Sequence, residues 1–347
     1  MSQNKKRLLG IAAIGFSAML AVSGCSGQAA PAPTDSQSES PAAETPASDP
    51  INVGLFVANA FGDHSYYDAA AATIDQLESD FNAKVTTYEG KLDTQNYGPL
   101  LQDAADQNEL VYVVGNQVID ALAQAAAQNP DTTFVFLNGF VPGGEVVSAT
   151  FRNAEKCYPA GVLAALLNEE HGSNVAGFMG GLEVAPILDC EAGFTQGVAA
   201  TDSAMEVATR MVGAFDQPAK GLETAVALEQ AGAYAIFAFA GLSSQGALAA
   251  VDAGSDLAPI MSAVPQVPPT SPAAFNEETS VLMLSIIEQF VDGSLEKGSV
   301  KSFGFADGAL TVIFNDALIS ADQRSQAEAA IDDIIGGSIV PEGAPRS

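Results

Sequence analysis

The chain has 347 residues, of which 48% are hydrophobic, and it carries 42 acidic residues against 13 basic ones, giving a net charge of −29. Nucleic acid and anionic membrane surfaces would repel so acidic a protein, and we expect neither as a binding partner. The acidic surplus is sufficiently explained by solubility and does not by itself indicate a cationic ligand.

The first 24 residues have the profile of a signal peptide. Three basic residues at 5–7 precede an apolar run over 8–22, which is shorter than the roughly 20 residues needed to cross a membrane as a helix. The sequence Val22-Ser23-Gly24-Cys25 resembles the bacterial lipobox, whose cysteine receives a lipid before cleavage. We therefore expect a lipidated Cys25 that attaches the protein to the lipid bilayer, on the extracytoplasmic side of the cell membrane. The alternative is ordinary secretory cleavage at a nearby small residue.

Residues 25–50 are expected to form a linker after the lipid anchor. They are mainly Ala, Pro, Ser, Thr and Gln, and no large apolar residue is available for a core. A flexible coil of this length spans on the order of 25 to 30 Å. Removing the signal peptide removes three of the 13 basic residues, so the processed protein from Cys25 onward has ten basic residues against 42 acidic ones and a net charge of −32.

From residue 51 onward, short β-rich runs alternate with longer amphipathic stretches. We expect strands over 51–57, 83–88, 110–114, 133–137, 174–178, 205–212, 234–239 and 309–314, and a strand-like run over 146–151. We expect helices over 66–80, 96–108, 117–128, 158–170, 187–201, 217–231, 243–253, 276–291 and 321–335. This alternation predicts an α/β protein with mostly parallel sheets flanked by helices. Continuously apolar runs such as LVYVV agree, because both faces of such a sheet are covered.

The alternation is interrupted near 146–151, where we place the first crossing between two lobes. The expected domain covers 51–341. Its first lobe is about 51–150 with a later segment near 263–300, and its second lobe is about 151–262 with part of the C-terminal region. Residues 342–347 are then a tail. Ligands of open α/β sheets bind beyond the carboxyl ends of the strands, so two facing lobes would bind a ligand between them.

The chain contains none of the common enzyme motifs. We find no phosphate-binding G-x-x-x-x-G-K-[ST], no G-x-G-x-x-G, no G-x-S-x-G and no H-E-x-x-H. His64 beside Asp63 could be drawn as a base with its orienting acid, but a capping role is the simpler interpretation. We expect no enzyme activity and no cofactor. The two histidines do not stand at ligand spacing from a cysteine, so we expect no metal site.

Two cysteines remain after lipidation of Cys25. In an oxidising compartment Cys157 and Cys190 would pair as a disulfide, and the alternative is two separately buried thiols.

Three segments together resemble one family. They are Phe61-Gly62-Asp63-His64-Ser65-Tyr66-Tyr67, the stretch from Gly177 to Glu183 that leads to Glu191-Ala192-Gly193-Phe194, and Ile334-Ile335-Gly336-Gly337. They look like the basic membrane protein family of substrate-binding lipoproteins, whose best-understood members bind purine nucleosides for ABC importers. The resemblance implies a two-lobed type I periplasmic-binding fold, a small-molecule ligand and an ABC permease as the membrane partner.

We predict ligand-binding residues from the resemblance and from the predicted strand ends. Most of them also have a possible role in the fold alone. Tyr66 and Phe215 match the family's two aromatic positions that sandwich a base, and ordinary core packing is the alternative. Asp63 and Ser65 could bind the ligand or cap a helix. Gly180 and Gly181 allow close approach of a ligand or form a tight turn. The remaining candidates, all near the ends of predicted strands, are Asn59, Asn116, Glu183 and Gly241.

The chain differs from the family at two positions that bind the ribose of a nucleoside. An acidic residue and a downstream lysine hold the ribose in the family, and an ungapped comparison places Ala263 and Ala274 there. Each lost hydrogen bond to a charged group is worth about 1.5 to 3 kcal/mol, so a ribose would bind poorly unless something compensates. We therefore expect a binding protein for an ABC importer whose ligand has a flat part. The alternative is a surface sensor or interaction lipoprotein that kept the fold and lost the ligand.

Overall fold

A computed structural model describes residues 49–347, except 64–65, 143 and 346–347. The expected signal peptide, Cys25 and nearly all of the linker lie outside the described residues, as do Ser65 and His64. None of the helices in the described ranges is long and apolar enough to span a membrane.

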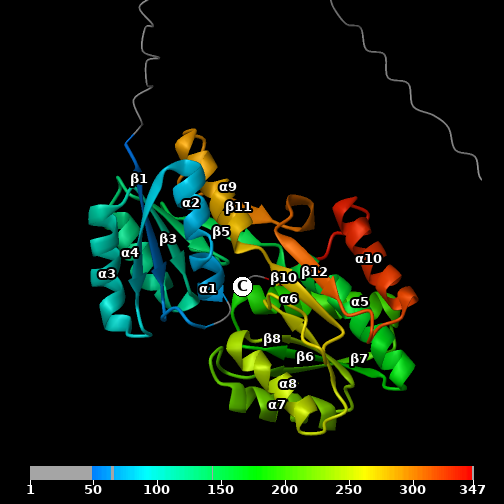
Figure 1. The fold of residues 1–347 in the computed structure, drawn as a ribbon. Coiled ribbons are helices and arrows are strands. Elements are labelled where there is room, and N and C mark those ends of the chain that lie inside the picture. Colours follow the sequence, from blue (N-terminus) through cyan, green and yellow to red (C-terminus); the bar gives the residue numbers. More distant parts are fainter. Residues whose placement is uncertain (1–48, 64–65, 143, 346–347) are drawn as a thin grey trace, which may run out of the picture. The chain divides into compact units, whose positions relative to one another are not determined.

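The first sheet is built entirely from parallel strands (Figure 1). Its spatial order is β11-β5-β4-β3-β1-β2. The bounds are β1 Ile51–Val57, β2 Ala83–Glu89, β3 Leu110–Val114, β4 Thr133–Leu137, β5 Val147–Phe151 and β11 Val300–Phe303. Every residue of β3 and β4 is buried, as expected for apolar strands covered on both faces.

Two groups of helices cover the two faces of this sheet. The helices α1 Tyr66–Ala71, α2 Ile74–Phe81 and α9 Thr279–Val291 pack on one face, and α3 Thr94–Gln107 and α4 Ile119–Gln128 pack on the other. The single helix expected over 66–80 is therefore two helices, interrupted at residues 72 and 73.

The second sheet has the order β12-β10-β9-β8-β6-β7, and within it only β12 runs antiparallel. The bounds are β6 Val175–Gly180, β7 Glu206–Met211, β8 Ala235–Phe239, β9 Ala258–Ser262, β10 Ala273–Glu277 and β12 Leu310–Phe314. The helices α5 Asn153–His171, α6 Ala185–Thr201 and α10 Ala321–Ile335 cover one face, and α7 Pro218–Gln230 and α8 Gln245–Asp252 cover the other. The predicted two-lobed α/β fold is confirmed.

The chain crosses between the two sheets three times: after β5 into α5, after β10 into α9, and after β11 into β12. The expected lobe boundary at 263 is wrong, because β10 belongs to the second sheet and the chain returns to the first only at α9. The ring of Phe275 explains the placement, since its centroid lies 6.3 Å from those of both Phe237 and Phe314 in that sheet's core.

The helices α5 and α6 are packed unusually closely. A Cβ added to Gly197 would lie 2.0 Å from the carbonyl oxygen of Tyr158, and one added to Gly193 would lie 2.2 Å from that of Ala154. A disulfide between Cys157 and Cys190 joins the same two helices, with their Cα atoms 5.2 Å apart. The C-terminal residues expected as a tail also contact α6, where the backbone N–H of Ala344 donates to the carboxylate of Asp189.

Candidate functional site

A cavity of about 420 Å³ lies where the carboxyl ends of strands from both sheets meet. Loops after β1, β2, β3 and β4 line it from the first sheet, and residues at or after the ends of β6, β7, β8, β9 and β10 line it from the second. This is the position at which open α/β sheets bind ligands.

Six predicted site residues line this cavity: Asn59, Asp63, Tyr66, Asn116, Phe215 and Gly241. Asp63 also caps a helix, because its carboxylate accepts the backbone N–H groups of Tyr67 and Asp68 at 3.1 and 3.0 Å. The structural role of Asp63 thus coexists with a place on the cavity wall.

Two of the predicted glycines, Gly180 and Gly181, are not among the residues that line the cavity. A Cβ on Gly181 would be 2.1 Å from the ring of Phe215, and a Cβ on Gly180 would be 2.4 Å from the sulfur of Met211. Gly181 therefore makes room for the Phe215 ring and does not itself line the cavity. Glu183 is exposed in the loop between β6 and α6 and is not among the residues that line the cavity, so its role in binding stays a prediction.

Aromatic side chains from both lobes contribute to the walls of the cavity. Phe61, Tyr66 and Tyr67 contribute from the first-sheet side, and Phe215 and Phe239 contribute from the second-sheet side. Tyr66 and Phe215 therefore come from different lobes, which is the arrangement a clamp on a flat ring requires.

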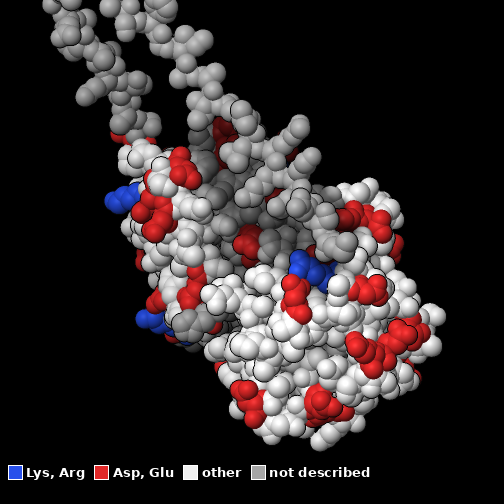
Figure 2. All heavy atoms as spheres, turned by 45° about the vertical axis from the view of Figure 1, so that its right-hand side comes forward, with Lys and Arg blue, Asp and Glu red and all other residues white. Residues whose placement is uncertain are grey.

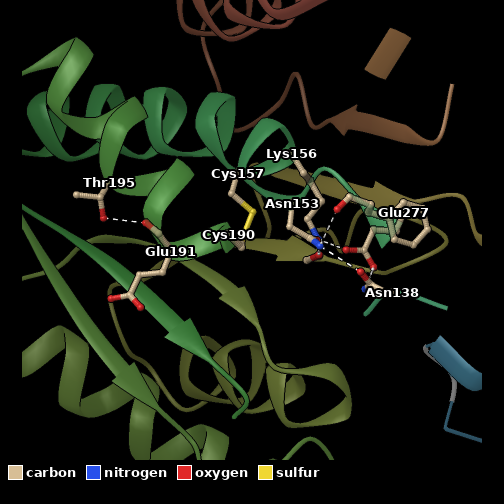
Figure 3. The surroundings of a disulfide bond; sticks show 10 residues. Asn138, Asn153, Lys156, Cys157, Cys190, Glu191, Thr195 and Glu277 are labelled. Atoms are coloured by element: carbon tan, nitrogen blue, oxygen red, sulfur yellow. Dashed lines mark hydrogen bonds and ion pairs between the residues drawn. A yellow bond between two sulfur atoms is a disulfide. The ribbon is translucent and has the colours of Figure 1, made fainter. Parts of the chain in front are cut away.

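Three important residues, Asn138, Lys156 and Glu277, were missed by the sequence analysis. Figure 3 shows them pointing toward one another beside the disulfide. The Lys156 ammonium lies 2.7 Å from Glu277 Oε1, and the Asn138 amide lies 3.5 Å from Glu277 Oε2. Lys156 is fully buried, and the side chain of Glu277 is only 4% exposed. An acid at the end of a strand would have indicated Glu277, but a helix was predicted over 276–291 and the strand before it was not recognised.

The two alanines at the family's ribose-binding positions have different surroundings. Ala263 lines the cavity, whereas Ala274 is buried in the core between the second sheet and the helices α7 and α8. Glu277, three residues after Ala274, is one of the acids that line the cavity.

Carboxylates dominate the electrostatics of the cavity. Asp63, Asp216 and Glu277 are on its lining, and no lysine or arginine is among the described residues that line it. Figure 2 shows acidic side chains spread over one face of the protein, with few basic ones between them. Burial lowers the pKa of Lys156, and the attraction of Glu277 opposes this shift.

Tyr66, which lines this cavity, has a buried hydroxyl group without a hydrogen-bond partner. Burial, followed by the negative charge of Glu277, raises the pKa of Tyr66 well above its ordinary value, so the hydroxyl keeps its proton. Across the residues that the structure covers, no group of three His, Cys, Asp or Glu side chains could hold a metal ion.

Known proteins resemble this chain in sequence. The nucleoside-binding protein BmpA of an ABC transporter in Lactococcus lactis is 27% identical over 242 residues, which is 68% of this chain and 66% of that protein, just under two thirds of its length. Basic membrane protein D of Borreliella burgdorferi is 25% identical over 291 residues, covering 77% of this chain and 80% of that protein. Relatives from three Pyrococcus species are named lipoproteins.

The solved structures show the same fold. An ABC transporter solute-binding protein from Aeropyrum pernix superimposes with a TM-score of 0.74 over 86% of this chain and 94% of that chain, at 22% identity. The sequence model of the Bmp family, described as "ABC transporter substrate-binding protein PnrA-like", matches residues 51–256. A match over more than half of the chain, on a two-lobed fold with a cavity at the strand ends, shows that this chain belongs to the Bmp family of ABC transporter substrate-binding proteins.

Proposed function

We propose that this protein captures a small molecule with a flat, nucleoside-like ring and delivers it to an ABC permease. The observation that carries the proposal is the pair of aromatic residues, Tyr66 and Phe215, on cavity walls from different lobes. A cavity of about 420 Å³ falls within the 300 to 1,000 Å³ typical of small-molecule sites. Closing the lobes over the ring would require hinge motion at the three crossings and no bond chemistry.

The anchor places the protein beside its permease. We propose that Cys25 carries the lipid and that the linker holds the binding domain outside the membrane. The lipobox-like sequence and the lipoprotein names among the relatives support this. Substituting Cys25→Ala should release the protein from the membrane fraction into the medium or periplasm, and continued detergent-dependent membrane association would count against lipidation.

Ligand binding can be tested by thermal shift and calorimetry with adenosine, guanosine, inosine, uridine and their free bases. A ligand present at 100 times its Kd stabilises the folded state by about 2.7 kcal/mol, which a melting curve resolves. No stabilisation by any of these compounds would refute nucleoside capture and favour the sensor or interaction alternative.

The variant Phe215→Ala tests the aromatic clamp. Stacking contributes about 0.5 to 1.5 kcal/mol beyond the buried area, so affinity should fall at least 2- to 13-fold and further through lost burial. Phe140→Ala is the matched control, because Phe140 is 45% exposed and does not line the cavity. Equal affinity in the two variants would contradict a role for Phe215 in stacking.

A further inference from the structure

A buried ion pair forms part of the cavity wall at the point where the chain crosses between the sheets. Lys156 lies in the first turns of α5, just after the first crossing, and Glu277 ends β10, just before the second. The Lys156 ammonium donates to Glu277 Oε1 at 2.7 Å and to Ser262 Oγ at 3.1 Å, and it lies 3.4 Å from the centroid of the Phe239 ring. Every direction of approach to this ammonium is therefore occupied by protein, and only Glu277 of the ion pair lines the cavity.

The geometry leaves acceptor capacity on Glu277. Lys156 engages Oε1, while the amide of Asn138 approaches Oε2 at only 3.5 Å, the outer limit of a hydrogen bond. A carboxylate offers about four lone-pair sites, so it can accept at least one further bond. The pair between Lys156 and Glu277 thus holds an acceptor at the cavity wall (Figure 3).

The Tyr66 hydroxyl supplies an independent observation at the same cavity. It is buried without a partner, and a buried hydroxyl that makes no hydrogen bond is costly. Tyr66 and Glu277 line the same cavity. A ligand group placed between them would need to donate a hydrogen bond to the Glu277 carboxylate and to form a second hydrogen bond with the Tyr66 hydroxyl.

We propose that Glu277 anchors a neutral hydroxyl of the ligand, with Tyr66 as the second contact and Lys156 as the residue that positions the Glu277 carboxylate. This inference rests on the proposed function. A hydroxyl can donate to Glu277 and accept from Tyr66 at the same time, which an ammonium group cannot do. Because Lys156 and Glu277 already neutralise each other, a charged ligand group here would leave a buried charge without compensation.

The hydroxyl-binding group formed by Glu277 and Lys156 compensates for the alanines at 263 and 274. It provides an acid from β10, the strand that also contains Ala274, and this acid is held by a lysine from α5. A ligand with a flat ring and a hydroxyl-bearing part therefore fits the cavity, and the expectation that a ribose is lost no longer follows from those two alanines alone.

The experiment measures the affinities of adenosine and inosine alongside those of adenine and hypoxanthine, which lack the sugar hydroxyls. Glu277→Gln should weaken the nucleosides about 10- to 100-fold, as expected for losing a hydrogen bond to a charged group, and leave the bases unchanged. Glu278→Gln is the matched control, because Glu278 is the next residue and is absent from the cavity lining. An equal loss of affinity for nucleosides and bases, or no loss of affinity, would refute the proposal that Glu277 binds a ligand hydroxyl. Wild-type protein that binds none of the four compounds would instead refute the proposed function.

Glu277→Gln leaves the Lys156 charge buried without its partner, which destabilises the folded state, so a second variant is needed. The double variant Lys156→Met with Glu277→Gln removes both charges and should fold, yet show the same selective loss of nucleoside affinity. Recovery of nucleoside affinity in the double variant would show that the lower affinity of Glu277→Gln came from disturbed folding. It would refute a hydrogen bond from the ligand hydroxyl to Glu277.

Lys156→Met alone tests positioning. Without the ammonium that holds Oε1, the Glu277 carboxylate loses its fixed position, so nucleoside affinity should fall while base affinity stays unchanged. A loss that is equal for nucleosides and bases would show that Lys156 has a structural role only.

Discussion

Removing the disulfide should destabilise the second lobe by an amount that follows from its place in the chain. Cys157 and Cys190 are separated by 33 residues and are both fully buried, so the double variant Cys157→Ala, Cys190→Ala is a cleaner perturbation than a reductant. The chain-entropy relation for a loop of this length gives about 3.7 kcal/mol at 25 °C. With an unfolding entropy of about 2.1 cal/mol/K per residue over about 300 residues, this corresponds to a fall of about 6 °C in Tm.

The assay is thermal unfolding of the oxidised wild type and the double variant, followed by circular dichroism under the same conditions. The disulfide joins α5 and α6, the helices that pack closely on the second sheet, and α5 also begins at the first crossing between the lobes. A Tm within 1 °C of the wild type would refute the reasoning, because it would mean that the bridge restricts the unfolded chain far less than its loop length requires.

Two further predictions concern packing and pH. Gly197→Ala should lower the free energy of unfolding by about 1 to 3 kcal/mol, because the new methyl group would clash with the Tyr158 carbonyl. The control is Gly98→Ala, on the exposed side of α3 with nothing within 4 Å, which should be neutral or stabilising. Equal urea midpoints for the two variants would contradict the close helix packing. Burial raises the pKa of Tyr112 well above its ordinary value, so the folded state keeps a proton that the unfolded state loses near pH 10. This contribution to stability is complete below about pH 10 and falls by about 1.4 kcal/mol per pH unit above it. Urea midpoints between pH 9 and 11 should therefore decline less steeply in Tyr112→Phe, and identical slopes in the two proteins would contradict the assignment.

The sheet strands that sequence periodicity predicted were those with strong local signals. The runs over 110–114 and 133–137 are continuously apolar and form fully buried central strands, which could be predicted without knowing their neighbours. The strands β9, β10 and β11 were missed. Residues 273–277 read AAFNE, a run with no β-branched residue and only Phe275 as a large apolar side chain, so nothing local distinguishes it from the helix that follows.

The candidate site was predicted in part for a related reason. Tyr66 and Phe215 were identified through a family resemblance, and both line the cavity. Lys156, Asn138 and Glu277 stand far apart in the chain, and each looks ordinary in its own segment. Their grouping depends on where three separate elements end, which no local pattern encodes.

The fold class, the acidic character and the family resemblance of this protein can be inferred from its residues alone, because hydrophobic periodicity, charge counts and short motifs are local properties of a chain. Three other features emerge only when the chain is folded: the lobe that each late segment joins, the contact of Cys157 with Cys190, and the buried lysine that holds the acid at the cavity wall. Those outcomes depend on contacts between distant segments, where the packing of Phe275 or the pairing of Lys156 with Glu277 outweighs any local preference.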